Sequence, residues 1–149
     1  MVRPSISVGK ELNMQSCLMD IKVHSDPVRG SLSVIESNLQ VPFDIKRVFY
    51  IYGAKHDVRR GGHAHYKTRQ ALISISGSCK VSLDNLKRVD EVSLDAPQTM
   101  LLLEPDDWHE MYDFSEDCIL LVLASHHYES EDYIHSYDDF CEVYKNEVL

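Results

Sequence analysis

The sequence lacks long apolar runs, a basic leader and an excess of positive charge. Its longest apolar stretches, residues 118–124 and 100–103, are as long as strands and far shorter than the roughly 20 residues of a membrane helix. No basic segment followed by an apolar one is visible near the start, so we expect no secretory signal and a cytoplasmic location. Fifteen basic against 24 acidic residues give a net charge of −9, which repels phosphate backbones and anionic membranes. We therefore expect neither a nucleic-acid partner nor a membrane partner.

Cysteine is scarce and unpaired in the sequence. The four cysteines, Cys17, Cys79, Cys118 and Cys141, are far apart, form no C-x-x-C motif and stand among apolar residues. This distribution predicts four buried free thiols in a reducing compartment.

The composition is otherwise that of one globular domain. The chain has 149 residues, of which 44% are hydrophobic and 26% charged, which fits a single domain spanning residues 1–149. Residues 1–13 show no clear pattern. We expect them either to be disordered or to add an edge strand to a partner subunit.

Short apolar segments separated by turn residues predict an all-β domain. About eight to ten strands are expected, and the clearest are residues 17–23, 31–35, 45–52, 71–75, 79–83, 89–94, 99–103 and 119–124. At the C-terminus Tyr133, Tyr137, Phe140, Tyr144 and Val148 recur every three or four residues, which predicts one helix. So many short strands in one domain favour a closed barrel or jelly roll, a fold that holds a small ligand inside.

The most informative segment is Arg59-Arg-Gly-Gly-His-Ala-His65. On a strand, residues two apart point to the same side, so His63 and His65 are expected to project together. The two glycines before them allow close backbone approach, and the arginines beside them supply positive charge. A polar outer face is the alternative interpretation of this spacing.

The residues that follow favour a site over a surface. His65 is followed after four residues by Gln70 and, six residues later, by Gly77. This resembles the first motif of the cupin superfamily, G-x5-H-x-H-x3–4-E-x6-G, with Asp57 at the leading glycine and Gln70 at the glutamate.

A second segment resembles the second cupin motif. Pro105-Asp-Asp-Trp-His109 is followed by Asp113, and the resemblance makes His109 the third cupin histidine. The implied fold is an RmlC-like cupin jelly-roll barrel, to which the periodicity above adds a short C-terminal helix.

Gln70 bears on whether a metal is bound. Typical cupin metal sites combine three imidazoles with one carboxylate, and Gln70 removes that charge. Three histidines alone can bind zinc, but we expect no metal and no other cofactor, with the imidazoles free to move protons.

A closer resemblance covers most of the chain, from about Asp26 to Tyr137. The motifs that carry it, in order, are Pro42-Phe-Asp-Ile-Lys-Arg-Val-Phe-Tyr-Ile51, Arg60-Gly-Gly-His-Ala-His65, Ser76-Gly-Ser78, Trp108-His-Glu-Met111, Asp113-Phe114, Val122-Leu-Ala-Ser125 and Asp132-Tyr-Ile134. They resemble the nucleotide-sugar 3,4-ketoisomerases. The resemblance implies a metal-free jelly roll, a homodimer, and a dTDP-linked 4-keto-6-deoxy sugar converted to its 3-keto isomer for deoxyamino-sugar biosynthesis.

The histidines suit that chemistry. Moving a ketone from C4 to C3 requires removal of the C3 proton and return of a proton to C4 through an enediol. Imidazole both accepts and donates protons near neutral pH. His63 matches the position that the family uses as base, and we assign His65 the complementary proton shuttle. One histidine performing every transfer remains an alternative.

Arginines are expected to hold the negative groups of the substrate. Arg47 and Arg60 are the candidates for the pocket, with surface salt bridges as the alternative, and Gln70 and His109 complete the substrate-binding set. In the family that this chain resembles, the pair preceding the second strand governs the face on which C4 is reprotonated. Arg29-Gly30 resembles the members that give a galacto-configured product.

Aromatic residues have two possible roles. Trp108, Tyr50, Tyr52 and Tyr133 could stack on the base or cover the sugar, although core packing is the more common role. Phe49 stands where some relatives have a tyrosine, so one hydroxyl near the sugar is absent.

Two alternative functions remain at this stage. One is a nucleotide-sugar 3,5-epimerase, whose usual pairing of histidine with aspartate is not found in the sequence. The other is a non-catalytic cupin that binds a small ligand.

Overall fold

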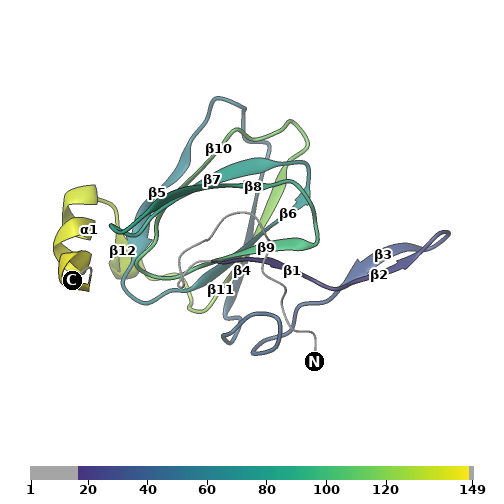
Figure 1. Cartoon of the computed structure of the whole chain (residues 1–149), viewed down its shortest axis with the longest axis horizontal. Helices are drawn as coiled ribbons and strands as arrows, with labels where there is room; N and C mark the ends of the chain where they lie inside the picture. The colour runs from purple at the N-terminus through teal and green to yellow at the C-terminus, as the bar shows by residue number, and fades with distance from the viewer. Residues whose placement is uncertain (1–16, 148–149) are drawn as a thin grey trace.

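Two five-stranded sheets face each other and enclose the core of the protein (Figure 1). The computed structural model describes residues 17–147, without the side chain of Cys17. The first sheet has the strand order β1-β9-β6-β11-β4 and the second β12-β5-β10-β7-β8, and all pairings within them are antiparallel. The expected all-β jelly roll is confirmed.

The elements have the following bounds. The first sheet contains β1 (Cys17–Asp20), β4 (Arg47–Tyr52), β6 (Gln70–Ser76), β9 (Thr99–Leu103) and β11 (Ile119–Ala124). The second contains β5 (Arg60–His65), β7 (Cys79–Asp84), β8 (Val89–Leu94), β10 (Trp108–Tyr112) and β12 (Tyr133–Ile134). A separate hairpin consists of β2 (Val23–Asp26) and β3 (Gly30–Ser33), and the C-terminal part contains η1 (Ser130–Asp132), α1 (Tyr137–Tyr144) and η2 (Lys145–Glu147).

The main core lies between the two sheets. In β7 the buried residues alternate with half-buried ones, so Val81 and Leu83 face inward with a period of two. Leu72, Leu101 and Leu120 of the first sheet belong to the same buried cluster. Each leucine side chain removed fully from water stabilises the fold by about 1.5–3 kcal/mol.

The first sheet is also covered on its outer face. Ile73 and Met100 pack there with Val41 and Phe43, which belong to the long connection between β3 and β4. Because both faces of this sheet are covered, β6 and β9 are almost continuously buried. This explains why their sequences read as apolar runs rather than as alternating patterns.

Three expectations about elements need correction. The single strand expected at residues 17–23 is divided between β1 and β2, where the chain leaves the sheet for the hairpin. The described residues form twelve strands, and β10 and β12 were not expected as strands. Tyr133 lies in β12 rather than on the helix, which begins only at Tyr137, and Val148 lies outside the described residues.

The helix α1 closes one side of the second sheet. The hydroxyl of Ser136 caps it by accepting a hydrogen bond from the backbone N–H of Asp139 at 3.3 Å. Phe140 and Tyr144 are buried against Ala64 of β5. No helix within residues 17–147 has the length and hydrophobicity that crossing a bilayer requires.

The thiols only partly match the expectation. Cys79 and Cys118 are buried and free, as predicted, but Cys141 is only half-buried. The side chain of Cys17 and the expectation for residues 1–13 lie outside the part of the chain that is described.

Candidate active site

Close approach of β5 and β10 creates the centre of the site. Gly61 has a φ of +85°, and a Cβ there would lie 2.8 Å from the carbonyl oxygen of His109. Only glycine permits this approach. The register then pairs His63 directly with His109, next to an irregularity between His109 and Glu110. The two strands thereby bring histidines 46 residues apart in the sequence into one cluster.

Three imidazoles meet at this point. The ring of His63 lies 5.2 Å from that of His65 and 4.7 Å from that of His109, centroid to centroid. His65 and His109 are buried, and His63 is half-buried. The predicted convergence of His63 and His65 is therefore observed, with His109 beside them.

A buried carboxylate holds one of these imidazoles. Nδ1 of His65 lies 3.0 Å from Oδ2 of Asp132, and both side chains are buried. The Thr68 hydroxyl also donates to Oδ2, and the Lys67 backbone N–H donates to Oδ1 at 2.8 Å. Burial works to raise the pKa of Asp132, but these hydrogen bonds outweigh it and hold the pKa below its ordinary value.

The charge of Asp132 fixes the tautomer of His65. An ionised carboxylate only accepts hydrogen bonds, so Nδ1 of His65 carries the proton and Nε2 presents a lone pair. Nε2 is buried and has no hydrogen-bond partner among residues 17–147. In the same way His109 lies 3.0 Å from the carbonyl oxygen of Asp107 through its Nδ1, which leaves its Nε2 as an acceptor. Both imidazoles thus offer basic nitrogens.

All three imidazoles are neutral at pH 7. Burial lowers the pKa of His63 to about 3, aided by His109 and His135 and opposed by a hydrogen bond with the Gly61 backbone. Burial likewise lowers the pKa of His65 and of His109 to about 4 each. For His65 the charges of His63 and Arg47 act in the same direction, whereas Asp132 opposes them. Neutral imidazoles are ready to accept protons.

Lowering the pH from 7 to about 4.5 is expected to reduce the free energy of unfolding. The unfolded chain binds more protons in this range, because the pKa of each imidazole returns to its ordinary 6.5 there. Asp107 acts in the opposite sense, since burial raises its pKa to about 8, but one carboxyl opposes three imidazoles. Urea unfolding at several pH values, with chelator present, measures the slope. His109→Asn should flatten it, and an unchanged slope would contradict this account.

The cluster opens into a cavity of about 220 Å³ between the two sheets. Among the predicted site residues, His63, His109, Gln70 and Arg60 line this cavity. Gln70 is buried and Arg60 is exposed, so the cavity extends from the core to the surface.

Arg47 lies against the same cavity. Its guanidinium is 5.2 Å from the ring of Phe49, and Nη1 donates to the Tyr133 hydroxyl at 3.4 Å. Its Nε is buried and has no hydrogen-bond partner within the part of the chain that the structure describes. Arg59, in contrast, is paired with Glu110 at 2.8 Å and covers the ring of Tyr112.

The Arg29-Gly30 pair is not part of this cavity. Both residues are exposed at the turn of the β2–β3 hairpin, where Asp26 accepts the backbone N–H of Arg29 at 2.7 Å. Figure 1 shows this hairpin projecting from the barrel on the side opposite α1. Within one chain, therefore, Arg29 and Gly30 do not lie in the cavity next to the histidines.

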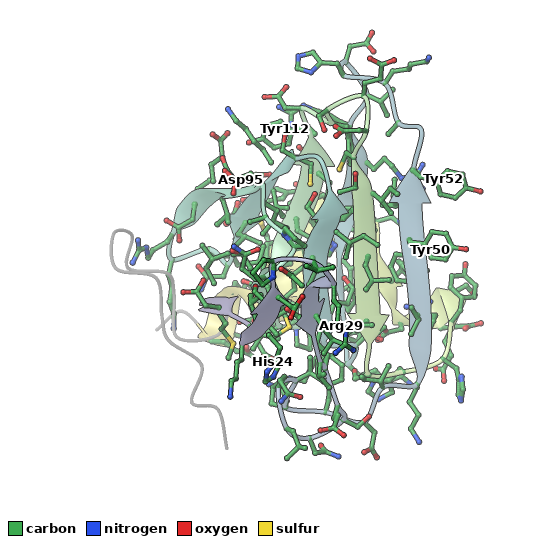
Figure 2. All side chains as sticks on the ribbon, turned by 90° about the vertical axis from the view of Figure 1, so that its right-hand side faces the viewer. His24, Arg29, Tyr50, Tyr52, Asp95 and Tyr112 are labelled. Atoms are coloured by element: carbon green, nitrogen blue, oxygen red, sulfur yellow. The ribbon has the colours of Figure 1, made fainter. Side chains whose placement is uncertain are left out.

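Of the four candidate aromatic residues, only Tyr133 faces the cavity. Tyr50 and Tyr52 lie on the outward face of β4, are largely exposed and stack on each other at 5.7 Å (Figure 2). Trp108 packs edge-on against Tyr137 of α1. The predicted stacking role remains open for Tyr133 alone.

Two residues that contact the histidine cluster were missed from the sequence. Asp132 was noted only as part of a motif, and His135, whose ring lies 5.9 Å from that of His63, was not noted at all. Asp132 is 67 residues from His65, and no local pattern announces the pair. The pair of His65 and Asp132 is the histidine–aspartate pairing that was not found in the sequence. Its supposed absence was held against a 3,5-epimerase, and that inference was wrong.

The histidine cluster also has the spacing of a metal site. One nitrogen from each of His63, His65 and His109 lies within 4.8 Å of the others. Asp132 and the Asp107 carbonyl orient two of these rings, as partners of metal-bound histidines often do. The fourth ligand position of the cupin motif is the neutral amide of Gln70, so the residues fit zinc better than a harder cation.

A jelly roll that carries a cluster of three histidines, two of which line a cavity between its sheets, defines a cupin. The family model "FdtA: WxcM-like, C-terminal" matches residues 14–145. A TDP-4-oxo-6-deoxy-alpha-D-glucose-3,4-oxoisomerase from Aneurinibacillus thermoaerophilus is 50% identical over 112 residues, covering 75% of this chain and 81% of that protein. The chain belongs to this family, the nucleotide-sugar 3,4-ketoisomerases of the cupin superfamily.

Solved structures agree with this assignment. A 3,4-ketoisomerase from Thermoanaerobacterium thermosaccharolyticum, solved as a histidine-to-asparagine variant with TDP-4-keto-6-deoxyglucose, has a TM-score of 0.89 and 38% identity over 93% of this chain and 99% of that chain. A dTDP-4-dehydrorhamnose 3,5-epimerase from Bacillus anthracis shares the fold, with a TM-score of 0.73 and 16% identity over 88% of this chain and 82% of that chain. The second likeness concerns the fold alone.

Proposed function

We propose that this enzyme moves the keto group of TDP-4-keto-6-deoxyglucose from C4 to C3. The observation that carries the proposal is the pair of neutral imidazoles, His63 and His65, on one face of β5 and beside a cationic cavity. The keto group at C4 makes the neighbouring C3 proton acidic, and a neutral imidazole in the cavity is a suitable base.

The reaction follows from four proton movements. His63 removes the proton from C3, the electron pair forms the C3–C4 double bond, and the C4 carbonyl oxygen takes the negative charge. Protonation of that oxygen gives the enediol. A proton is then delivered to C4 while the C3 hydroxyl loses its own, and the carbonyl forms at C3. No redox partner is needed, because C4 is reduced as C3 is oxidised.

His65 suits the shuttle between these positions. Asp132 stabilises the imidazolium that forms when Nε2 of His65 accepts a proton, and this prepares the ring to give the proton back. His63 has no such carboxylate and is the stronger candidate for proton removal at C3. Transfer of every proton by one histidine remains the alternative.

The arginines hold the negative charges of the substrate. Arg60 lies at the exposed part of the cavity lining, where the diphosphate would enter. Arg47 lies deeper, and its buried Nε lacks a partner within the described chain, so it is placed for the sugar oxygens. Gln70 and His109 complete the substrate pocket.

We further propose a homodimer in which the hairpin of one protomer serves the site of its partner. Exposed apolar side chains cover the hairpin and the outer face of β4, among them Leu32 and Val48. A cavity of about 500 Å³ separates the hairpin from the outer face of the first sheet. The hairpin projects from the barrel (Figure 1), its residue Arg29 does not line the cavity of its own chain, and a second copy related by two-fold symmetry would receive it.

Mixed dimers of two variants test this arrangement. His63→Asn and Arg29→Ala should each lose activity as homodimers, whereas a heterodimer of the two contains one intact site if Arg29 acts in the partner. We expect activity to return when the differently tagged chains are coexpressed and purified as a heterodimer. Heterodimers as inactive as the parent variants would contradict the exchange, and a monomer in sedimentation equilibrium would contradict the dimer.

Arg29 and Gly30 also bear on the product. An arginine brought to the sugar by the hairpin changes which face of C4 is open to the proton donor. We propose that C4 is reprotonated to give the galacto-configured dTDP-3-keto-6-deoxy sugar. The coupling constants of the C4 proton in the NMR spectrum of the product distinguish it from the gluco isomer.

Removal of metal is expected to leave the activity unchanged. The imidazoles supply the proton transfers by themselves, and Gln70 replaces the carboxylate of metal-binding cupins. Activity after dialysis against EDTA, with the metal content measured by mass spectrometry, should stay within about twofold of the untreated enzyme. A loss that stoichiometric zinc, iron or manganese restores would overturn the expectation.

Carbon-13 NMR tests the proposed function. With substrate labelled at C4, the resonance of the labelled carbonyl should disappear and that of a hydroxyl-bearing carbon should replace it. A label that remains a carbonyl would contradict the proposal.

We keep the cytoplasm as the proposed location, since Cys79, Cys118 and Cys141 are free thiols.

A further inference from the structure

Tyr133 packs against both of the imidazoles proposed for catalysis. The register of β12 on β5 places it opposite His65, with ring centroids 4.6 Å apart. The ring of His63 lies 5.0 Å away. Because Tyr133 and His63 both line the cavity, a sugar held there against His63 also meets the Tyr133 side chain.

The hydrogen bond from Arg47 orients the Tyr133 hydroxyl. Arginine has only donors, so the Tyr133 oxygen must be the acceptor in its 3.4 Å contact with Nη1 of Arg47. The proton of the hydroxyl is therefore available to another acceptor.

The cavity requires such a donor. Proton removal at C3 places negative charge on the C4 oxygen, and that charge needs a hydrogen-bond donor in a site shielded from water. The inward nitrogens of His65 and His109 present lone pairs, since their protons are directed to Asp132 and to the Asp107 carbonyl. Neutral in this form, neither ring can donate to the substrate oxygen.

We propose that Tyr133 is a further catalytic residue, which donates a hydrogen bond from its hydroxyl to the C4 oxygen of the substrate. The hydrogen bond strengthens as that oxygen becomes the negatively charged oxygen of an enediolate. Arg47 orients the Tyr133 hydroxyl by donating a hydrogen bond to its oxygen. Gln70 and Arg60 also line the cavity. Tyr133 differs from them because it packs against both imidazoles and accepts a hydrogen bond from the Arg47 guanidinium. This inference rests on the proposed ketoisomerase activity.

The variant Tyr133→Phe isolates the hydroxyl, because it keeps the ring that packs on both histidines. Loss of one oxyanion donor typically lowers kcat by about 10²–10³-fold, and we expect a fall of about 10²-fold with KM changed less than about threefold. Exchange of the C3 proton with deuterated solvent should slow by a similar factor. The matched control is Tyr137→Phe, which removes an exposed hydroxyl bonded to Asp84 at 2.7 Å.

The outcomes separate this inference from the function on which it rests. If the wild-type enzyme converts the substrate and Tyr133→Phe retains its kcat and C3 exchange rate, the role of Tyr133 is overturned while the ketoisomerase stands. If the variant loses affinity but not kcat, Tyr133 only binds the sugar and the proposal fails. If the wild type itself converts nothing, the proposed function falls first.

Discussion

Replacing His63 by asparagine is expected to lower kcat by about 10³-fold and to leave the fold intact. General-base catalysis by a positioned side chain contributes about 10²–10⁴-fold, and His63 is the base assigned to the C3 proton. Asparagine has a similar size and lies opposite His109 on β10 without disturbing the backbone pairing. Steady-state kinetics on TDP-4-keto-6-deoxyglucose, with a thermal melt of the same sample, measures both effects.

The control for this variant is His56→Asn. His56 is an exposed histidine 3.9 Å from Asp113, outside the cavity lining. Its replacement should leave kcat within about twofold of wild type, as surface substitutions usually do. A His63→Asn enzyme that folds and keeps more than a tenth of its activity would remove His63 from the role of base.

Replacing Asp132 by asparagine is expected to lower kcat by about 10²-fold or more. The carboxylate keeps the proton of His65 on Nδ1, whereas an amide can donate to Nδ1 and so favour the tautomer that protonates Nε2. The buried Nε2 then loses its lone pair. Asp132 acts through His65 and is a positioning residue, so kcat should fall far more than KM rises.

The tautomer is the readout that separates positioning from general damage. Nitrogen-15 NMR of the His65 ring should show the proton on Nδ1 in the wild type and on Nε2 in the variant. Glu129→Gln is the matched control, because Glu129 is an exposed carboxylate whose side chain pairs with Lys67 at 2.6 Å. A variant with unchanged tautomer and full activity would show that Asp132 serves only the fold.

The strands that could be predicted are those that pack on apolar surfaces. Residues 89–94, 99–103 and 119–124 are strands with the expected bounds, because hydrophobic side chains fill the inner face or both faces of their sheets. β10 was missed because its inward residues include His109, whose burial serves the cavity rather than the apolar core. A strand that lines a polar site loses the pattern by which strands are recognised.

Part of the candidate site could be predicted from strand geometry. His63 and His65 are two residues apart on one strand, so strand geometry alone places them together. Asp132 and Tyr133 belong to the two-residue strand β12 and its preceding turn, which are too short to show a period. Their role depends on the pairing of β12 with β5, a contact between distant parts of the chain. Only the folded arrangement reveals it.

The Arg29-Gly30 pair shows a different limit. The pair lies at the turn of the β2–β3 hairpin, and the positive φ of Gly30, +86°, explains the glycine. Sequence order does not show whether such a turn approaches its own barrel or another copy. The structure shows that the hairpin projects from the barrel, and the mixed dimers described above test the proposed approach to a second copy.

A proton NMR time course in deuterated water tests the central claim most directly. The enzyme, treated with chelator, is mixed with freshly prepared TDP-4-keto-6-deoxyglucose. If His63 and His65 exchange protons with the substrate through an enediol, a 3-keto product should appear with deuterium at C4. Deuterium entering at C5 while the carbonyl stays at C4 would indicate epimerase chemistry and contradict the account.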